Sequence, residues 1–349
     1  MQVLLFSLLT GAIGAQAAAI GPRQSRKFNL QGHRGSRGET SESTIAAFAW
    51  ALIDGVTTLE LDNGITKDGV AVVWHDEAIV PEKCRDTAPV TANDPTFPYV
   101  GKNIQDLTLA QIKTLDCGSQ RLAEFPLQLN YPGTKISTLR EVFQFAACAD
   151  PFRQIQWNVE SKINPVYGNT RTPEDFVNAQ LTEFLRSGYK LSQITYQSFD
   201  WRTLVLMQKR EPKIPISALL DPISLTLHGG TYPLLAGLNL ADFPGGEPAL
   251  QAVHAAKSIG ASVLSPATGE LSSLFTTKAM VDQAHALGLT VVPWTVNRLD
   301  VVERLLELGV DGLITDYPRS IGRLLQQKGY DIPSGSFTSW IGMCAGMSI

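Results

Sequence analysis

The chain has 349 residues, of which 44% are hydrophobic and 18% are charged, and its formal net charge is −4 at pH 7. This composition supports a large buried core and excludes a globally disordered protein. It also excludes a strongly basic surface, so we expect neither a nucleic-acid partner nor binding to an anionic membrane surface. The length suits a single barrel domain of ~250 residues that carries insertions.

Residues 1–17 are predicted to be a secretory signal peptide. A short apolar run, which includes Leu4, Leu5 and Phe6, leads to Ala15-Gln16-Ala17, the small-x-small pattern of a cleavage site. No Lys or Arg precedes the run, although most signal peptides have one there. The alternative is an N-terminal membrane anchor, but the stretch is shorter than the ~20 residues that a span requires. We therefore expect a secreted protein without stable membrane insertion.

Secretion makes the four cysteines candidates for disulfide bonds. Cys84 and Cys117 lie in one loop-rich segment, which favours a bond between them. Cys148 and Cys344 then either pair or remain free. Because no two cysteines have C-x₂-C spacing, a zinc site is not expected.

From Phe28 onward, short apolar runs alternate with helical patterns. Strands separated by helices pair in parallel with right-handed crossovers, so eight such units predict a closed (β/α)₈ TIM barrel over residues 28–330. An open, doubly wound α/β sheet is the alternative. Residues 331–349 are expected to form a C-terminal tail. The eight candidate strands are Asn29–His33, Thr58–Asp62, Ile155–Glu160, Ile194–Ser198, Ile214–Leu220, Ser262–Ser265, Thr290–Val296 and Gly312–Thr315.

The intervening helices have recognisable ends. Thr172 is expected to cap a helix that stops at Gly188, with an apolar face comprising Phe176, Val177, Leu181, Phe184 and Leu185. Asn297 is expected to cap a later helix that ends at Gly309.

Two segments depart from the regular alternation of strands and helices. Val70–His75 follows the second strand after only Lys67-Asp68-Gly69, a turn that predicts a hairpin rather than a helical crossover. Residues 77–134 then form a long polar insertion, expected to be a lid or a small subdomain over one face of the barrel. Residues 221–247 are expected to form another long loop.

Three carboxylates are predicted to form a cation site at the carboxyl ends of the strands, where barrel enzymes place their reactive groups. Glu60 and Asp62 are two residues apart in one strand and therefore point to the same side, and Glu160 ends the next barrel strand. Confined carboxylates repel each other unless a cation lies between them, and an all-oxygen site suits Ca²⁺ or Mg²⁺. The alternative is that the acids only form salt bridges with Arg34 and Lys162.

Two of the five histidines, His33 and His75, are placed at strand ends among polar residues. A histidine pair suits cleavage of a phosphate ester, because one imidazole accepts a proton from the attacking oxygen and the other donates one to the leaving oxygen. Arg34 and Lys162 are placed to hold the phosphoryl oxygens. His228, His254 and His285 are expected to be surface or structural residues.

These residues occur in an order that resembles the glycerophosphodiester phosphodiesterase family. The motifs that carry this resemblance extend over nearly the whole mature chain: His33-Arg34-Gly35, Glu42-Ser43-Thr44, Glu60-Leu61-Asp62, Thr66-Lys67-Asp68-Gly69, His75-Asp76, Asn158-Val159-Glu160-Ser161-Lys162, Gln197-Ser198-Phe199, Trp294-Thr295-Val296-Asn297 and Gly312-Leu313-Ile314-Thr315-Asp316-Tyr317-Pro318. Each motif is weak alone, but together they are specific.

The resemblance implies that Glu60, Asp62 and Glu160 hold a divalent cation, that His33 and His75 act as acid and base, and that the insertion partly covers the site. It also implies that Arg34 and Lys162 touch the phosphate. The family usually has Pro-Glu-Asn-Thr where this chain has Ser41-Glu42-Ser43-Thr44, and Ser43 can still cap the following helix.

Three further residues keep two interpretations each, and for one of them, Asn297, the alternative to the helix cap is contact with the substrate. Glu42 either orients His33 or Arg34, or is a helix-start charge. Trp294 either walls the site beside a glycerol group or fills the barrel mouth. Asp316 is expected to be structural.

Three functions follow from this pattern. The first is metal-dependent hydrolysis of a small-molecule glycerophosphodiester to glycerol 3-phosphate and an alcohol, with no obligate protein partner. The second is phospholipase D-like cleavage of a lysophospholipid or sphingomyelin through a cyclic phosphate, which the long insertion disfavours. The third is non-catalytic binding of a phosphorylated ligand, which the complete set of expected catalytic residues disfavours.

Overall fold

The computed structural model describes residues 26–270, 272–333 and 338–347. The predicted signal peptide, residues 1–17, lies outside these residues. No helix within the described part of the chain is both long enough and apolar enough to cross a membrane.

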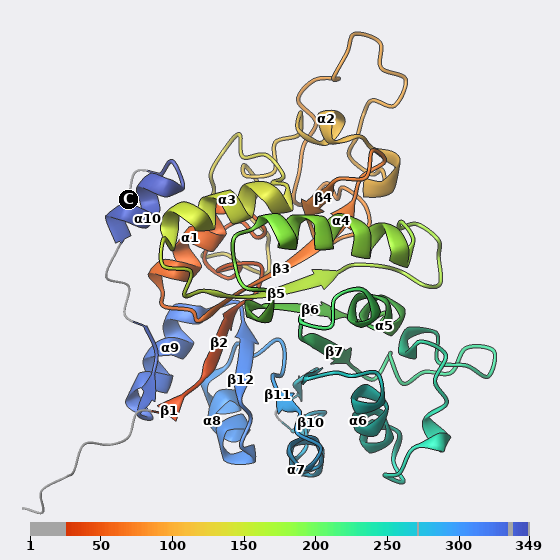
Figure 1. The fold of residues 1–349 in the computed structure, drawn as a ribbon. Helices are drawn as coiled ribbons and strands as arrows, with labels where there is room; N and C mark the ends of the chain where they lie inside the picture. The colour runs from red at the N-terminus through yellow and green to blue at the C-terminus, as the bar shows by residue number, and fades with distance from the viewer. Residues whose placement is uncertain (1–25, 271, 334–337, 348–349) are drawn as a thin grey trace, which may run out of the picture.

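Eight parallel strands form the central sheet (Figure 1). The first seven strands pair in succession, and the eighth pairs with the first, with Gly312 opposite Asn29. The seventh and eighth strands are joined by separate backbone hydrogen bonds, such as Val296 N to Ile314 O at 2.8 Å. These bonds close the circle, so the structure confirms the (β/α)₈ barrel and excludes the open sheet. In chain order the strands are β2 (Asn29–Gly32), β3 (Thr58–Ile65), β5 (Gln156–Ser161), β6 (Ile194–Ser198), β7 (Ile216–Leu220), β8 (Val263–Pro266), β11 (Thr290–Val291) and β12 (Gly312–Thr315).

The predicted strands agree with these bounds to within two residues except at two places. β3 continues to Ile65, because its last residues pair with the following hairpin strand. β11 stops at Val291 although a strand up to Val296 was expected. Pro293 has no amide hydrogen to donate, which interrupts the ladder there.

One helix follows each strand and packs on the outside of the barrel (Figure 1). Thr172 caps its helix as predicted, in a reciprocal arrangement with Asp175. Leu185, however, is 63% exposed, so its assignment to the apolar face of that helix was wrong. Leu185 follows the buried Phe184 directly, and successive helical residues point about 100° apart. The outer helices are α1 (Ile45–Ile53), α3 (Leu139–Ala149), α4 (Pro173–Arg186), α5 (Trp201–Arg210), α6 (Pro248–Ser258), α7 (Lys278–Ala286), α8 (Leu299–Leu308) and α9 (Pro318–Gln327).

The insertion after β3 has its own small core. It follows the hairpin strand β4 (Ala71–Val73), which pairs antiparallel with the end of β3 as the hairpin prediction required. It also holds a 3₁₀ turn, η1 (Ile104–Asp106), and α2 (Leu109–Ile112). Its buried side chains form a cluster separate from the barrel core: Val72, Trp74, Ile79, Cys84, Tyr99, Ile104, Leu107, Ile112, Leu115, Cys117 and Ile136.

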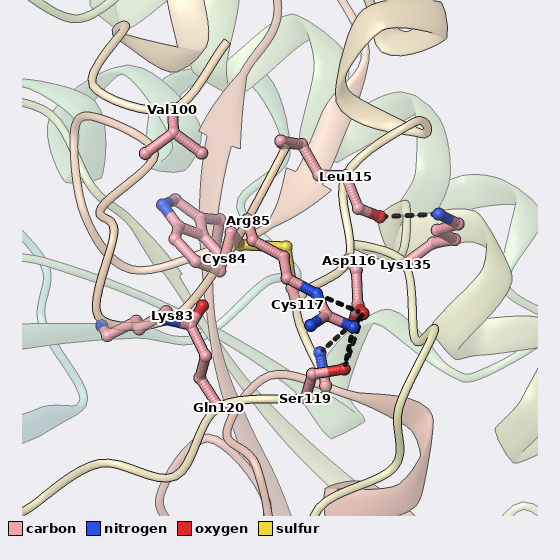
Figure 2. Close-up of a disulfide and its surroundings, with 12 residues drawn as sticks. Lys83, Cys84, Arg85, Val100, Leu115, Asp116, Cys117, Ser119, Gln120 and Lys135 are labelled. Carbon is pink, nitrogen blue, oxygen red and sulfur yellow. Dashed lines mark hydrogen bonds and ion pairs between the residues drawn. A yellow bond between two sulfur atoms is a disulfide. The ribbon is translucent and has the colours of Figure 1, made fainter. Parts of the chain in front are cut away.

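Two disulfide bonds join distant parts of the chain. Cys84–Cys117 lies within the insertion, which confirms the predicted pairing (Figure 2). Cys148–Cys344 ties α3 to the C-terminal helix α10 (Thr338–Cys344). The first bond stabilises the small core, and the second holds the C-terminal segment on the outside of the barrel.

The remaining elements are short. β1 (Arg26–Lys27) pairs with β13 (Tyr330–Asp331), and β9 (Gly269–Glu270) pairs with β10 (Ser273–Leu274). A 3₁₀ turn, η2 (Leu191–Gln193), precedes β6. The predicted long loop over residues 221–247 contains only η3 (Pro233–Leu235) and η4 (Leu240–Asp242).

Candidate active site

A cavity of about 240 Å³ opens at the carboxyl ends of the barrel strands. Both predicted histidines and all three predicted carboxylates line this one cavity, together with both predicted phosphate-binding cations. The structure therefore brings together residues that are up to 129 positions apart between His33 and Lys162. The lining residues are His33, Arg34, Arg37, Glu60, Asp62, His75, Glu160, Lys162, Gln197, Phe199, Leu219, Trp294, Thr295 and Ile314.

The His33 side chain is oriented by Asp316, the residue that follows the last barrel strand. Its Nδ1 lies 2.6 Å from Oδ1 of Asp316, the residue directly after β12. A carboxylate only accepts hydrogen bonds, so Nδ1 carries the proton and Nε2 has the free lone pair. Asn297 fixes the carboxylate in turn, because its Nδ2 donates to Asp316 Oδ2 (2.6 Å) and its Oδ1 accepts from the Asp316 backbone (2.9 Å).

This contact corrects two predictions. Asn297 does not cap α8: the residue at the cap is Arg298, and it makes no side-chain cap bond. Asp316 is not only structural, because it orients a histidine of the cavity. The sequence signal for both was their place directly beyond the ends of neighbouring strands, where side chains point into the barrel mouth.

His75 is held from the insertion side. Its Nδ1 lies 3.0 Å from Oδ1 of Asp76, and Asp76 also accepts a hydrogen bond from Lys83. The His75 side chain is 28% exposed, whereas that of His33 is 11% exposed. In both imidazoles Nδ1 is bound to a carboxylate, but His75 is more exposed to solvent than His33.

Both imidazoles are neutral near pH 7. Burial lowers the pKa of His33, and the positive charge of Arg34 adds to this against the opposing effect of Asp316. Burial, with the charges of Lys162 and Arg34, lowers the pKa of His75 to about 4. Each Nε2 is therefore available to accept a proton.

The three carboxylates form a compact, buried cluster. One oxygen from each of Glu60, Asp62 and Glu160 lies within 4.8 Å of the others, and the residues are 1–5% exposed. The geometry follows from the sheet: Glu60 and Asp62 point the same way along β3, and Glu160 lies opposite Asp62 in β5.

The charges of this cluster are not balanced by the protein alone. Burial and the neighbouring Asp62 raise the pKa of Glu60 well above its usual range. Burial, reinforced by Asp62 and opposed by Lys162, raises the pKa of Glu160 to about 8. Burial would also raise the pKa of Asp62, but His75, which is protonated in the acidic range where this carboxyl titrates, acts together with Arg34 and Lys162 to hold that pKa below its usual range.

The donor set fits a hard divalent cation. The Oδ2 atom of Asp62 is buried without a hydrogen-bond donor, although Arg34 Nε lies 3.3 Å away as an ion pair. A buried acceptor without a donor, beside two carboxyl groups whose pKa values are raised, is the arrangement that Ca²⁺ or Mg²⁺ would satisfy. The alternative predicted from the sequence, salt bridges alone, leaves this oxygen unsatisfied.

Two cations flank the carboxylates. Lys162 Nζ lies 3.0 Å from Glu160 Oε1, and Arg34 donates from NH1 to Glu42 Oε1 at 2.9 Å. Arg34 also donates its backbone N–H to Glu60 Oε2 at 2.8 Å, an orientation that its left-handed backbone (φ 50°) allows. Both cations therefore remain charged at the cavity wall.

Glu42 pairs with the arginines rather than with a histidine. It accepts from Arg34, from Arg37 Nε (2.5 Å) and from Lys83 Nζ (2.8 Å). Burial would raise the pKa of Glu42, but these three cations hold it well below its usual range. Of the two interpretations of Glu42, the contacts support the one in which it orients Arg34.

Ser43 does not cap α1, which corrects another prediction. The cap is Thr44, whose side chain accepts from Ala47 N. Ser43 instead has φ 59°, in the left-handed region where Asn is favoured among non-glycine residues. The Asn that the family usually has at this position therefore suits the backbone, and Ser43 keeps the same conformation.

Trp294 forms one aromatic wall of the cavity. Its Nε1 donates to Ser265 O at 2.8 Å, and its ring packs edge-on against Phe199 with centroids 5.3 Å apart. The two rings give the cavity an apolar side, and Lys162 Nζ lies over the Phe199 ring, 5.5 Å from its centroid.

Comparisons with known proteins show which family this chain resembles. A model described as the glycerophosphoryl diester phosphodiesterase family matches residues 33–320. The chain is 28% identical over 297 residues to a glycerophosphodiester phosphodiesterase of Caldanaerobacter subterraneus, across 85% of this chain and 97% of that protein. It is also 27% identical over 302 residues to a lysophospholipase D of Homo sapiens, across 83% of each.

Solved structures show the same fold. A putative glycerophosphoryl diester phosphodiesterase from Silicibacter pomeroyi superimposes with a TM-score of 0.71 and 27% identity, covering 89% of this chain and 97% of that one. A phosphodiesterase from Oleispira antarctica, solved with sn-glycerol-3-phosphate, gives a TM-score of 0.62 at 20% identity, covering 85% and 96%. The likeness therefore extends over most of the barrel.

Proposed function

The chain belongs to the glycerophosphoryl diester phosphodiesterase family and is a phosphodiesterase of that class, and we propose that it hydrolyses glycerophosphodiesters to glycerol 3-phosphate and a free alcohol by histidine acid–base catalysis with a divalent cation. The observation that supports this most is the single cavity lined by two carboxylate-bound histidines, three clustered carboxylates and two cations.

The cation would be held by Glu60, Asp62 and Glu160. When bound, it would offset negative charge that develops on the phosphoryl oxygens. Ca²⁺ and Mg²⁺ both suit the all-oxygen donors, and the cluster is compatible with either.

The side chains of this protein account for binding and proton transfer. Arg34 binds the phosphate through its planar guanidinium, which Glu42 orients, and Lys162 supplies a second positive charge. One of His33 and His75, with its Nε2 lone pair free, accepts the proton of the attacking hydroxyl. The other first takes up a proton from solvent on Nε2 and then, as an imidazolium, donates it to the oxygen of the departing alcohol. The Asp316 and Asp76 carboxylates stabilise whichever imidazole becomes positively charged.

The reaction can be tested by following release of choline from glycerophosphocholine. Enzyme stripped of metal should be inactive and should recover activity on addition of Ca²⁺, Mg²⁺ or Mn²⁺. Full turnover by enzyme that elemental analysis shows to be free of metal would contradict the proposed cation.

Lysophospholipid cleavage is a second candidate, because a curated relative of this chain is a lysophospholipase D. Phosphorus NMR of the products separates the two reactions. Glycerol 3-phosphate from the soluble diester supports the first proposal, whereas a lasting cyclic phosphate from a lysophospholipid supports the second.

We also propose that the protein works outside the cell. The two disulfide bonds are typical of proteins from oxidising compartments. Peptide mapping of the secreted protein for an N-terminus near Ala17 would test the predicted signal peptide.

A further inference from the structure

Lys83 lies between two parts of the candidate active site, the loop that carries Arg34 and Glu42 and the segment that carries His75 and Asp76. Its Nζ donates to Glu42 Oε1 at 2.8 Å and to Asp76 Oδ2, and its side chain is only 13% exposed. Glu42 in turn binds Arg34, and Asp76 binds His75. One ammonium group thus connects the phosphate-binding arginine to the histidine on the insertion side.

The position of Lys83 depends on the insertion and its disulfide. The next residue is Cys84, which is 1% exposed and bonded to Cys117 (Figure 2). On the other side of Cys84, the Arg85 and Asp116 backbones exchange two hydrogen bonds of 2.9 and 3.1 Å. Arg85 also pairs with the Asp116 side chain through two nitrogens, at 3.0 and 2.7 Å.

We propose that Lys83 is a positioning residue that orients His75 and Arg34 together, and that the Cys84–Cys117 disulfide maintains this orientation. This inference rests on the proposed function, because its main readout is diester hydrolysis. It adds a role for the oxidised insertion: full activity requires that the disulfide be formed.

The two contacts of Lys83 should differ in importance. Glu42 keeps Arg34 and Arg37 as partners when Lys83 is removed, so the arginine should be held almost as before. Within the described part of the chain, the Asp76 carboxylate has side-chain hydrogen bonds only with His75 and Lys83, so His75 should lose most of its orientation. The loss should therefore appear mainly in kcat rather than in KM.

The test compares Lys83→Met with Lys113→Met, a matched loss of a lysine ion pair elsewhere in the insertion, where Lys113 Nζ lies 2.5 Å from Glu141 Oε2 and away from the cavity. Lys83→Met should lower kcat about tenfold, with KM within about threefold, and Lys83→Arg should restore most of it. Lys113→Met should retain the wild-type kcat. Equal kcat values for the Lys83 and Lys113 variants, each with an intact melting transition, would overturn the proposal.

A spectroscopic readout separates orientation from general damage. The chain has five histidines, so the imidazole ¹⁵N–¹H signals can be assigned one by one. Lys83→Met should change the Nδ1 signal of His75 and leave that of His33 in place. Equal shifts of both rings, or no shift of His75, would count against a positioning role, and this holds even if glycerophosphocholine proves not to be a substrate.

The disulfide is tested with a second matched pair of variants. Cys84→Ala/Cys117→Ala should lose activity to about the same extent as Lys83→Met, and adding Lys83→Met to it should lower activity little further. Cys148→Ala/Cys344→Ala should remain active below its melting temperature. If the activity losses of Lys83→Met and Cys84→Ala/Cys117→Ala multiply in the combined variant, the disulfide does not act through Lys83 and the link is disproved. If the cysteine variant does not fold, the Lys83 variants decide alone.

Inactivity of the wild-type enzyme on every diester would instead remove the proposed function. In that case the imidazole signals still report whether Lys83 holds His75.

Discussion

The two histidines of the cavity have the same local contact but are supported by different parts of the molecule. His33 is bound by Asp316, which Asn297 fixes from the neighbouring strand end, so its support is built entirely from the barrel. His75 is bound by Asp76, which Lys83 fixes from the insertion. The Asp316 carboxylate is 2% exposed and the Asp76 carboxylate is 27% exposed.

This difference indicates which half of the site tolerates change. A buried hydrogen bond to a charged group costs more to remove than an exposed one, because no water replaces the lost partner. We call the support of His33 by Asp316 and Asn297 the barrel half of the site, and the support of His75 by Asp76 and Lys83 the insertion half. Substitutions in the barrel half should therefore lower activity strongly. Substitutions in the insertion half should lower it less, and activity there should depend on the disulfide.

The largest expected effect is removal of either imidazole. His33→Ala and His75→Ala should each lower kcat by ~10²–10⁴, the usual contribution of a positioned acid or base. His285→Ala is the matched control, because His285 also pairs with an aspartate, Asp311, at 2.9 Å, but on the surface away from the cavity. Wild-type turnover by either cavity variant would exclude the proposed acid–base pair.

Substitution of Asp316 and of Asp76 should show directly that the two histidines differ in how strongly they depend on their carboxylate partners. Asp316→Asn should lower kcat by roughly 10²-fold, because an amide can donate to Nδ1 and so place the imidazole proton on Nε2. Asp76→Asn should cost less, about tenfold, because water reaches this contact. Steady-state kinetics on the two variants measure both values, and a larger loss at Asp76 would reverse the comparison.

The affinity for the cation should depend on pH through the carboxyl groups on the barrel strands and not through the insertion. Glu160 has a raised pKa of about 8, so below that pH it holds a proton that the cation must displace. Affinity should therefore rise by about tenfold per pH unit for each displaced proton and level off above pH 8. Titration calorimetry in two buffers counts the protons. Lys83→Met should leave this profile unchanged, and an altered profile would show that the two halves are not separate.

The smallest expected effect is the difference between the two disulfides in their contribution to the unfolding free energy. They join residues 33 and 196 positions apart. On the chain-entropy model, removing the disulfide that closes the shorter loop costs about 4 kcal/mol of unfolding free energy. Removing the one that closes the longer loop costs about 5 kcal/mol. Denaturant unfolding of the two double variants should rank them in that order, opposite to the order of their activity losses. The same ranking in both measurements would mean that activity only reports stability.

Much of the barrel was predictable because its periodicity is local. Alternating apolar runs and caps such as Thr172 placed the strands and helices, and the i, i+2 spacing of Glu60 and Asp62 placed two of the carboxylates. Leu185 and Asn297 were misassigned, because both decisions depend on what the rest of the chain places beside them.

The support of the site was harder to predict. The contacts of Asp316 with His33 and of Lys83 with Asp76 join residues that are distant in sequence or lie in irregular segments, where no periodic pattern shows which way a side chain points. Asp316 and Asn297 carried a signal in their position after strands, whereas Lys83 carried none.

The separate hydrophobic cluster of the insertion has a thermal consequence. Barrel and insertion bury their side chains in distinct groups, so the smaller group can open while the larger one stays packed. On gentle heating, catalysis should then fade before the helical circular-dichroism signal of the barrel changes, and cooling should restore it. Such an enzyme would lose turnover through reversible local opening rather than through global denaturation.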